Sequence, residues 1–267
     1  MAAGGEETMI GWTGRVVNEQ FAHAGRMTLF AWQSVEAIAL PPYRVRETVR
    51  QMMLVGVQSL PIASLTALFV GMVMVLQTGY QLQKFGAKLY AAGITIVALT
   101  REMIPVFTAI VVGARVAASM TAELGTMKIT EQIDAMKSLA VDPTEYLVAP
   151  RVVATTLMLP ILTIYANVIG FLGGLIVGTT ALNIPYKVYI NNTTDLLWLG
   201  DIYTGILKTF FFGAIVGTVG CYFGFRTEGG AQGVGQATTT SVVATLILIL
   251  LFNFILSSWF LYLTAMM

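Results

Sequence analysis

Long stretches without a charged residue dominate this chain, and each is long enough to cross a lipid bilayer. The three uninterrupted stretches are 51–83, 152–186 and 229–267. Two more runs, 89–114 and 202–225, are interrupted only by Arg101-Glu102 and by Lys208. A helix needs about 20 apolar residues to span the hydrocarbon core, and only a helix or a closed barrel satisfies its backbone there. These runs therefore predict membrane-spanning helices.

Composition supports this prediction. Hydrophobic residues make up 56% of the chain and charged residues 11%, whereas soluble domains are about a quarter charged. We predict an all-α integral membrane protein with five transmembrane helices. They are expected at about 53–79, 90–115, 152–180, 203–224 and 239–263.

Several functional classes find no support in the sequence. A net charge of +1 gives no basic surface for nucleic acid. Cys221 and His23 are the single cysteine and histidine, which excludes a disulfide framework or a Cys/His metal site. The first residues lack the basic and apolar regions of a cleavable signal peptide. No phosphate loop, GxSxG elbow or HExxH motif is present, so no catalytic residue is predicted and energy must come from a partner or an ion gradient.

Basic residues predict the orientation. Five spans place the two termini on opposite sides of the membrane. With a cytoplasmic N-terminus, ten basic residues lie inside: Arg15, Arg26, Arg44, Arg46, Arg50, Arg115, Lys128, Lys137, Arg151 and Arg226. Three then lie outside: Lys84, Lys88 and Lys187. The positive-inside rule favours this orientation, which leaves the C-terminus outside.

The N-terminal segment differs from the rest. We predict an amphipathic helix lying in the membrane interface within residues 1–45, before a permease domain over 46–267. Its apolar stripe is Ile10, Val17, Phe21, Ala24, Trp32 and Val35, with Trp12 and Trp32 at headgroup depth and Pro41-Pro42 at its end. The alternative is a cytosolic helix packed on a partner.

A charged amphipathic segment, 121–151, separates the second and third spans. Its apolar residues recur near helical spacing: Leu124, Met127, Ile133, Met136 and Leu139. Charged residues occupy the other faces: Glu123, Lys128, Glu131, Asp134 and Lys137. The pattern indicates either a docking surface or a solvated helix that only connects two spans.

Two adjacent charges interrupt the second span. Arg101 and Glu102 have twelve uncharged residues on each side, and each charge costs several kcal/mol there unless it is paired or hydrated. Adjacent helical residues diverge by about 100° and pair poorly, so Lys208 is a possible partner for Glu102. Pro105 leaves the carbonyl of Arg101 without a donor. The alternatives are a functional cavity and a purely structural ion-pair network.

Glycines recur every four residues in the third span, at Gly170, Gly174 and Gly178. Small residues at this spacing let helix backbones approach closely. We predict that they serve helix packing, more within the chain than between copies.

Four stretches carry a family resemblance: Ala122–Ala135 (AELGTMKITEQIDA), Val141-Asp142-Pro143 with Pro150-Arg151, Leu99–Val106 (LTREMIPV) and Gly233–Thr239 (GVGQATT). Together they resemble the MlaE/YrbE family, over about residues 45–265. That family comprises permease subunits of ABC transporters that move phospholipid with MCE-domain proteins.

The resemblance implies partners and a setting. The permease would be a homodimer in a bacterial inner membrane and would contribute to outer-membrane lipid asymmetry. Each copy would bind an MlaF-type ATPase, which holds ATP and Mg, so this chain carries no cofactor. A ring of MCE-domain (MlaD-type) proteins and a small STAS-type (MlaB-like) subunit complete the expected assembly. Residues 121–139 would form the coupling helix, with contacts from Glu123, Leu124, Met127, Lys128, Glu131 and Asp134.

The resemblance also implies a phospholipid cavity between two permeases, lined by the first, second and fifth spans. Its expected residues are Arg101, Glu102, Lys208, Met74, Leu82 and Phe85. The family often has an acidic residue where this chain has Asn253. Two other hypotheses remain: an ion-coupled lipid or amphiphile transporter without an ATPase, and an intramembrane lipid enzyme. The absence of visible inverted repeats argues against the former, and the absence of a nucleophile–base pair against the latter.

Overall fold

The part of the chain that the structure describes is almost entirely helical, with short turns between the helices. This computed structural model describes residue 22, residues 25–38 and residues 44–266, the last four without their side chains. After a helix over 25–38, the main helices are α2 (Val45–Gly56), α3 (Leu60–Gln83), α4 (Ala91–Ala98), α5 (Ile104–Ile129), α6 (Gln132–Ser138), α7 (Ala149–Thr180), α8 (Tyr186–Leu196), α9 (Leu199–Phe225) and α10 (Gly230–Met266). A 3₁₀ turn, Val57–Ser59, joins α2 to α3, and a π-helical turn, Leu99–Met103, joins α4 to α5.

Five segments of the described chain are long and apolar enough to cross a membrane. They are Val45–Gln83, Lys88–Ile129, Thr144–Thr180, Leu199–Phe225 and Gly230–Tyr262. The prediction of an all-α protein with five spans is confirmed. The helices extend past most predicted boundaries, because polar ends of a span continue as helix beyond the hydrocarbon region.

Prolines mark the starts of three long helices. Pro61, Pro105 and Pro150 each occupy the first turn of their α-helix, directly after a short 3₁₀ or π-helical turn. Pro160 lies inside α7. Proline there removes one hydrogen bond of the helix and favours a bend.

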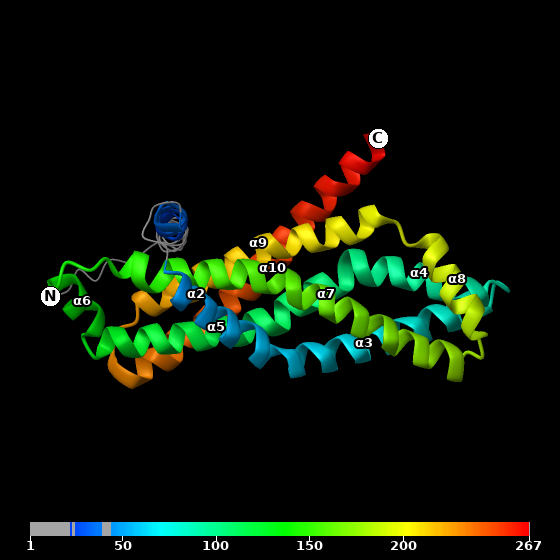
Figure 1. Cartoon of the computed structure of the whole chain (residues 1–267), viewed down its shortest axis with the longest axis horizontal. Coiled ribbons are helices and arrows are strands. Elements are labelled where there is room, and N and C mark those ends of the chain that lie inside the picture. Colours follow the sequence, from blue (N-terminus) through cyan, green and yellow to red (C-terminus); the bar gives the residue numbers. More distant parts are fainter. Residues whose placement is uncertain (1–21, 23–24, 39–43, 267) are drawn as a thin grey trace, which may run out of the picture.

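The long helices form an elongated bundle (Figure 1). α3 packs along α7, α5 packs along α9 and α10, and α7 also contacts α9. α6 lies at one end of the bundle, and α4 and α8 lie at the other (Figure 1). We call these the α6 end and the α8 end.

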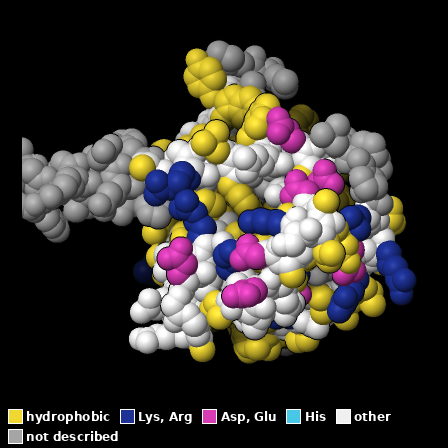
Figure 2. All heavy atoms as spheres, turned by 90° about the vertical axis from the view of Figure 1, so that its left-hand side faces the viewer, with side chains coloured by type: hydrophobic (Ala, Val, Ile, Leu, Met, Phe, Trp, Pro, Cys, Tyr) yellow, Lys and Arg dark blue, Asp and Glu magenta, His cyan; other side chains and the backbone are white. Residues whose placement is uncertain are grey.

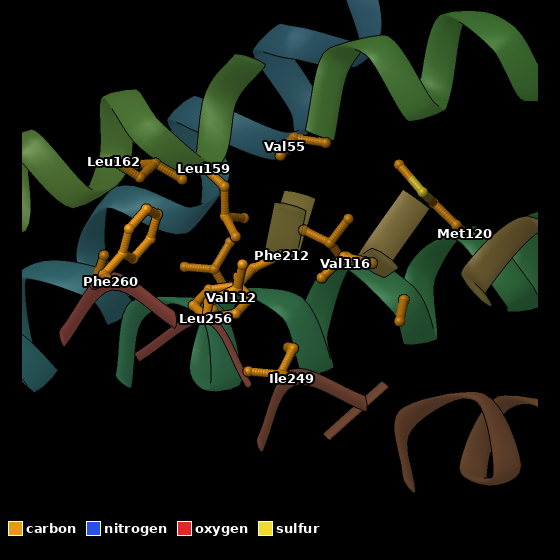
Figure 3. Close-up of a cluster of buried hydrophobic side chains, with 14 residues drawn as sticks. Val55, Val112, Val116, Met120, Leu159, Leu162, Phe212, Ile249, Leu256 and Phe260 are labelled. Atoms are coloured by element: carbon orange, nitrogen blue, oxygen red, sulfur yellow. The ribbon is translucent and has the colours of Figure 1, made fainter. Parts of the chain in front are cut away.

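The core lies where α5, α7, α9 and α10 meet. Figure 3 shows Val112 and Val116 of α5, Leu159 and Leu162 of α7, Phe212 of α9 and Ile249 of α10 converging in one cluster. Many large apolar side chains point outward instead. Examples are Leu65, Phe69 and Val73 on α3 and Ile247, Leu250 and Phe254 on α10. Such wide exposed apolar faces fit a surface covered by lipid or by another subunit.

Close approach of α3 and α7 depends on glycine. A side chain added at Gly71 would collide with the backbone carbonyl of Gly170. Gly174 and Gly178 face Val75 of α3 and the ring of Tyr189 of α8. The glycine ladder of the third span therefore packs helices within one chain.

The helix over 25–38 lies at the α6 end and has two different faces. Phe30 packs inward, with its ring 5.7 Å from that of Tyr222. Trp32 and Val35 are exposed, and the placement of this helix in the membrane interface stays a prediction. The other residues of the predicted stripe, Ile10, Val17, Phe21 and Ala24, lie outside the described residues, as do Trp12 and Pro41-Pro42.

Candidate functional site

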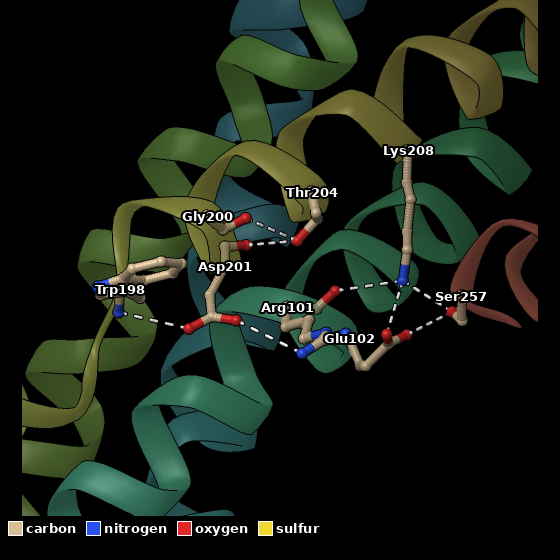
Figure 4. A network of polar contacts seen from close by, with 8 residues as sticks. All are labelled: Arg101, Glu102, Trp198, Gly200, Asp201, Thr204, Lys208 and Ser257. Atoms are coloured by element: carbon tan, nitrogen blue, oxygen red, sulfur yellow. Dashed lines mark hydrogen bonds and ion pairs between the residues drawn. The ribbon is translucent and has the colours of Figure 1, made fainter. Parts of the chain in front are cut away.

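Charged side chains from two spans and a serine hydroxyl from a third meet at one place inside the bundle (Figure 4). Lys208 of α9 donates to Oε1 of Glu102 at 2.7 Å and to the hydroxyl of Ser257 of α10 at 2.7 Å. Ser257 in turn donates to Oε2 of Glu102 at 2.9 Å. The predicted partnership of Lys208 with Glu102 is thus present, and the fifth span adds a hydroxyl to it.

Burial explains why this network is complete. Lys208 is 1% exposed, and an unpaired ammonium in such a place costs several kcal/mol. The backbone carbonyl of Arg101 lies 3.4 Å away as a further acceptor. Three acceptors therefore surround the ammonium, which matches its three N–H donors.

Arg101 is held much more loosely. Its Nη1 lies 3.6 Å from Oδ1 of Asp201, beyond ordinary hydrogen-bond distance. Its Nη2 is buried and finds no acceptor among the described residues. Asp201 also accepts from the backbone N–H of Trp198 at 3.3 Å, so its carboxylate is shared with the start of α9. Arg101 therefore keeps donor capacity for a ligand.

The backbone around these charges departs from a regular helix. Leu99–Met103 form a π-helical turn, closed by a bond from the N–H of Ile104 to the carbonyl of Leu99. Such turns occur often at functional sites, and Pro105, which follows, cannot donate to the carbonyl of Arg101. Gly205 lies directly against the carbonyl of Thr100, which lets α9 approach this turn closely.

The remaining predicted lipid contacts do not all gather here. Met74 is partly buried against the apolar cluster that contains Leu99 and Ile104, which flank the charged turn in the sequence. Leu82 packs in a different cluster near the α8 end, about 12 Å further along α3 at 1.5 Å per residue. Phe85 is 82% exposed in the turn after α3. The structure thus brings Arg101, Glu102 and Lys208 together, places Met74 in a neighbouring apolar cluster and leaves Leu82 and Phe85 apart.

Sequence reasoning missed Asp201 and Ser257. Asp201 directly precedes the run 202–225, so a weak signal existed in its position at the start of a span. Ser257 gave none, because serine is common in such helices. Asn253, which the sequence analysis singled out, lies one helical turn before Ser257 on α10. The Oδ1 atom of Asn253 is buried and has no hydrogen-bond partner among the described residues.

At the α6 end, the structure corrects the prediction of one coupling helix over 121–139. α5 continues to Ile129, the chain turns at Glu131 with a φ of 59°, and α6 covers only Gln132–Ser138. Leu124 is 0% exposed, because it packs with Ile133 in a cluster that joins α5 and α6 to α7 and α9. Leu124 therefore lies inside the isolated chain and not on its surface. Met127 and Met136 pack against the same cluster, whereas Leu139 is exposed.

Ion pairs hold this end together. Arg151, which is buried, pairs with Glu123 at 2.8 Å. Lys128 of α5 contacts both carboxylate oxygens of Asp134 of α6, at 3.1 and 2.8 Å. The hydrogen bond from Lys128 is the main cause that lowers the pKa of Asp134 below its ordinary value. Figure 2 shows this face, where basic and acidic side chains are interspersed. Glu131 and Asp134 remain exposed there.

Comparisons with known proteins agree with this architecture. The family model described as "Permease MlaE" matches residues 48–259. A probable ABC transporter permease protein of Rickettsia typhi is 39% identical over 87% of this chain and 90% of its own length. One of Synechocystis is 43% identical over 79% of this chain and 81% of its own. The chloroplastic protein TRIGALACTOSYLDIACYLGLYCEROL 1 of Arabidopsis thaliana is 35% identical over 87% of this chain and 66% of its own.

Proposed function

This chain belongs to the MlaE permease family, and from that premise we propose that it carries phospholipid across or out of a bacterial inner membrane as part of an ATP-driven transporter. As a multi-pass permease subunit, it supplies the path for the substrate. An MlaF-type ATPase supplies the energy. MCE-domain proteins on the periplasmic side exchange lipid with the outer membrane and so contribute to its lipid asymmetry.

The observation that carries the substrate proposal is the difference between Arg101 and Lys208. Lys208 is surrounded by acceptors from its own chain, whereas Nη2 of Arg101 has none among the described residues. Guanidinium groups bind phosphate in a two-pronged geometry. Arg101 therefore receives the lipid phosphate, while Glu102, Lys208 and Ser257 tie three spans together around it.

The proposed cycle uses a pair of these chains. Met74 and the apolar side chains near it contact the acyl chains in a cavity between two copies. Closure of the partner ATPase moves the α6 ends together, which changes access to that cavity. The basic bias predicts that the α6 end is cytoplasmic and that the C-terminus is periplasmic. A small STAS-type subunit would bind the ATPase.

Co-purification tests the partnership. Tagged full-length chain, extracted in mild detergent, should bring down an ATPase and an MCE-domain protein identified by mass spectrometry. Isolation of the chain alone, with lipid transport intact in vesicles without ATP, would instead support an ion-coupled transporter.

Photo-crosslinking tests the site. A diazirine amino acid at Met74 should capture phospholipid in the assembled complex, and Arg101→Gln should reduce that capture several-fold. The same probe at Leu162, which is buried in the core of the bundle, is the control and should capture none. Equal capture at Met74 with and without Arg101 would remove the proposed phosphate contact.

A further inference from the structure

We propose a second phospholipid site at the α6 end, separate from the transport path, in which Arg44 and Arg46 bind the phosphate and a groove between α2 and α7 holds an acyl chain. The lipid is a glycerophospholipid with a single phosphodiester from the leaflet that surrounds this end. It acts as a bound structural lipid and is not the transported substrate.

The groove is a largely apolar hollow of about 400 Å³, within the range of about 300–1,000 Å³ typical of ligand pockets. Three elements enclose it: the helix over 25–38, α2 and the start of α7. Its apolar lining comes mainly from Ile38, Val45, Val49, Met52, Pro150 and Val153. A hollow of this lining and size suits a hydrocarbon chain better than a polar ligand.

Charge changes abruptly at the mouth of the groove. Arg44 and Val45 line both the groove and a second, open hollow of about 850 Å³. Arg46, Arg50 and Tyr146 line only the second hollow. An apolar groove that opens beside three guanidinium groups is complementary to a phospholipid. The groove fits the acyl chain, and the guanidinium groups next to it fit the phosphate.

Arg44 keeps a donor for an anion. Its guanidinium lies over the ring of Tyr146, 4.2 Å from the centroid, which fixes the position of the side chain. Its Nε is buried and has no acceptor among the described residues. A buried donor without a partner is costly, and a phosphate oxygen in the neighbouring hollow supplies an acceptor.

The charges of the site match one phosphodiester. Three arginines (Arg44, Arg46, Arg50) and two acids (Glu47, Glu145) line the two hollows, which leaves one net positive charge. Arg50 is 3.3 Å from Glu47, so part of this charge is already balanced. Glu145 lines the groove and disfavours a headgroup with additional negative charge.

The surface of α2 places the site at the depth of lipid headgroups. Val45, Val49 and Met53 are more than half exposed and recur every four residues, so they form one apolar stripe. Val45 and Val49 line the open side of the groove, and Met53 lies outside its lining. Arg46 and Arg50 are exposed on a neighbouring face of the same helix. α2 continues into a membrane span, and apolar and basic side chains together are typical of the interface.

The test uses two adjacent methionines on α2. A diazirine amino acid replaces Met52, which lines the groove, or Met53, which faces outward. Each full-length protein, with the partners that co-purify with it, is placed in vesicles of phosphatidylethanolamine and phosphatidylglycerol. Adducts are identified by mass spectrometry, in the wild-type background and with Arg44→Gln/Arg46→Gln.

We expect a phospholipid adduct at Met52 that falls about tenfold in the double variant, as the loss of charge-assisted contacts predicts. The adduct at Met53, which reports surrounding lipid, should stay within about twofold and also show that the variant is folded. Arg46→Gln alone should give an intermediate loss. Arg26→Gln, a basic residue of the helix over 25–38 that lines a different hollow, should have no effect.

Three results would overturn the site: no adduct at Met52, an adduct insensitive to both arginine changes, or equal capture of a diacylglycerol that lacks the phosphate. The readout requires no transport and no ATP. Failure of the proposed transport function would therefore leave this result unchanged, and failure at Met52 would leave the Arg101 site untouched.

Discussion

The ammonium of Lys208 lies 2.7 Å from Oε1 of Glu102, so opposite charges from the fourth and second spans meet inside the bundle. Lys208 is almost fully buried, whereas the side chain of Glu102 is 32% exposed. Lys208 therefore depends more on Glu102 for charge compensation than Glu102 depends on Lys208. Single and double substitutions can measure this difference.

Removal of Glu102 should cost more than removal of both partners. Glu102→Ala leaves the buried ammonium with the weaker acceptors of Ser257 and the Arg101 carbonyl, and loss of one member of a buried pair costs about 3–5 kcal/mol. We expect the lower end of this range because Glu102 is only partly buried. Glu102→Ala/Lys208→Ala should recover part of the loss. The thermal midpoint of each variant in detergent, monitored by size-exclusion chromatography after heating, measures the loss and the recovery. Asp195→Asn on the surface of α8 is a neutral control. A double variant less stable than Glu102→Ala would contradict the pair.

Charge reversal at the α6 end should uncouple ATP hydrolysis from transport. Asp134→Lys replaces the contact of α6 with Lys128 by repulsion, and reversal at a docked face typically costs a few kcal/mol. Glu131→Lys changes the exposed surface at the turn without breaking that contact. Comparison of the two separates a surface effect from a shift of α6, with ATPase rate and lipid transport measured in vesicles. If the double variant Glu131→Lys/Asp134→Lys co-purifies with its ATPase and transports normally, α6 is not the docking element.

The contact between Lys128 and Asp134 should also have a predictable pH dependence. The pKa of Asp134 is lowered from its ordinary value of 3.8, mainly by the hydrogen bond from Lys128. Because the folded state has the lower pKa, the contact contributes fully above that ordinary value and is lost as the pH falls through the lowered pKa. Lys128→Ala should move the pKa of Asp134 back up, as measured by NMR of labelled carboxyl groups. An unchanged titration would show that the hydrogen bond is absent in solution.

Fusions to a reporter enzyme can test the orientation of the chain in the membrane. Ten basic residues on one side against three on the other predict a cytoplasmic N-terminus. A phosphatase that is active only outside the cytoplasm should be active when fused after Met267 and silent when fused after Gly230. The opposite pattern would reverse the assignment of the α6 end to the cytoplasm.

Glycine substitutions should distinguish packed from open positions. Gly71→Ala forces its new methyl group into the carbonyl of Gly170, and because a backbone atom cannot move aside cheaply, we expect a loss of more than about 2 kcal/mol. Gly235→Ala meets no atom within 4 Å and should be neutral or stabilising by up to about 1 kcal/mol. Thermal midpoints of the two variants give the comparison. Equal midpoints would show that α3 and α7 are less tightly packed than described.

Much of the architecture could be predicted from the sequence, for a simple reason. A span requires about 20 apolar residues, so charge-free runs such as 152–186 locate it without knowledge of its neighbours. The same argument singled out Arg101, Glu102 and Lys208, because a charge within such a run needs a partner. Lys208 was then the charge available from the fourth run, and the structure joins it to Glu102.

Tertiary structure decided which face of each helix meets which neighbour. Leu124 and Leu139 both belong to the apolar pattern of 121–151, yet Leu124 is buried and Leu139 is 77% exposed, because the turn at Glu131 folds α6 back onto the bundle. Ser257 and Asp201 acquired their roles only when α10 and the start of α9 came beside the π-helical turn. The periodicity of a sequence identifies which face of a helix is apolar. A contact such as that between Glu102 and Ser257, 155 positions apart, depends on how the helices pack against one another.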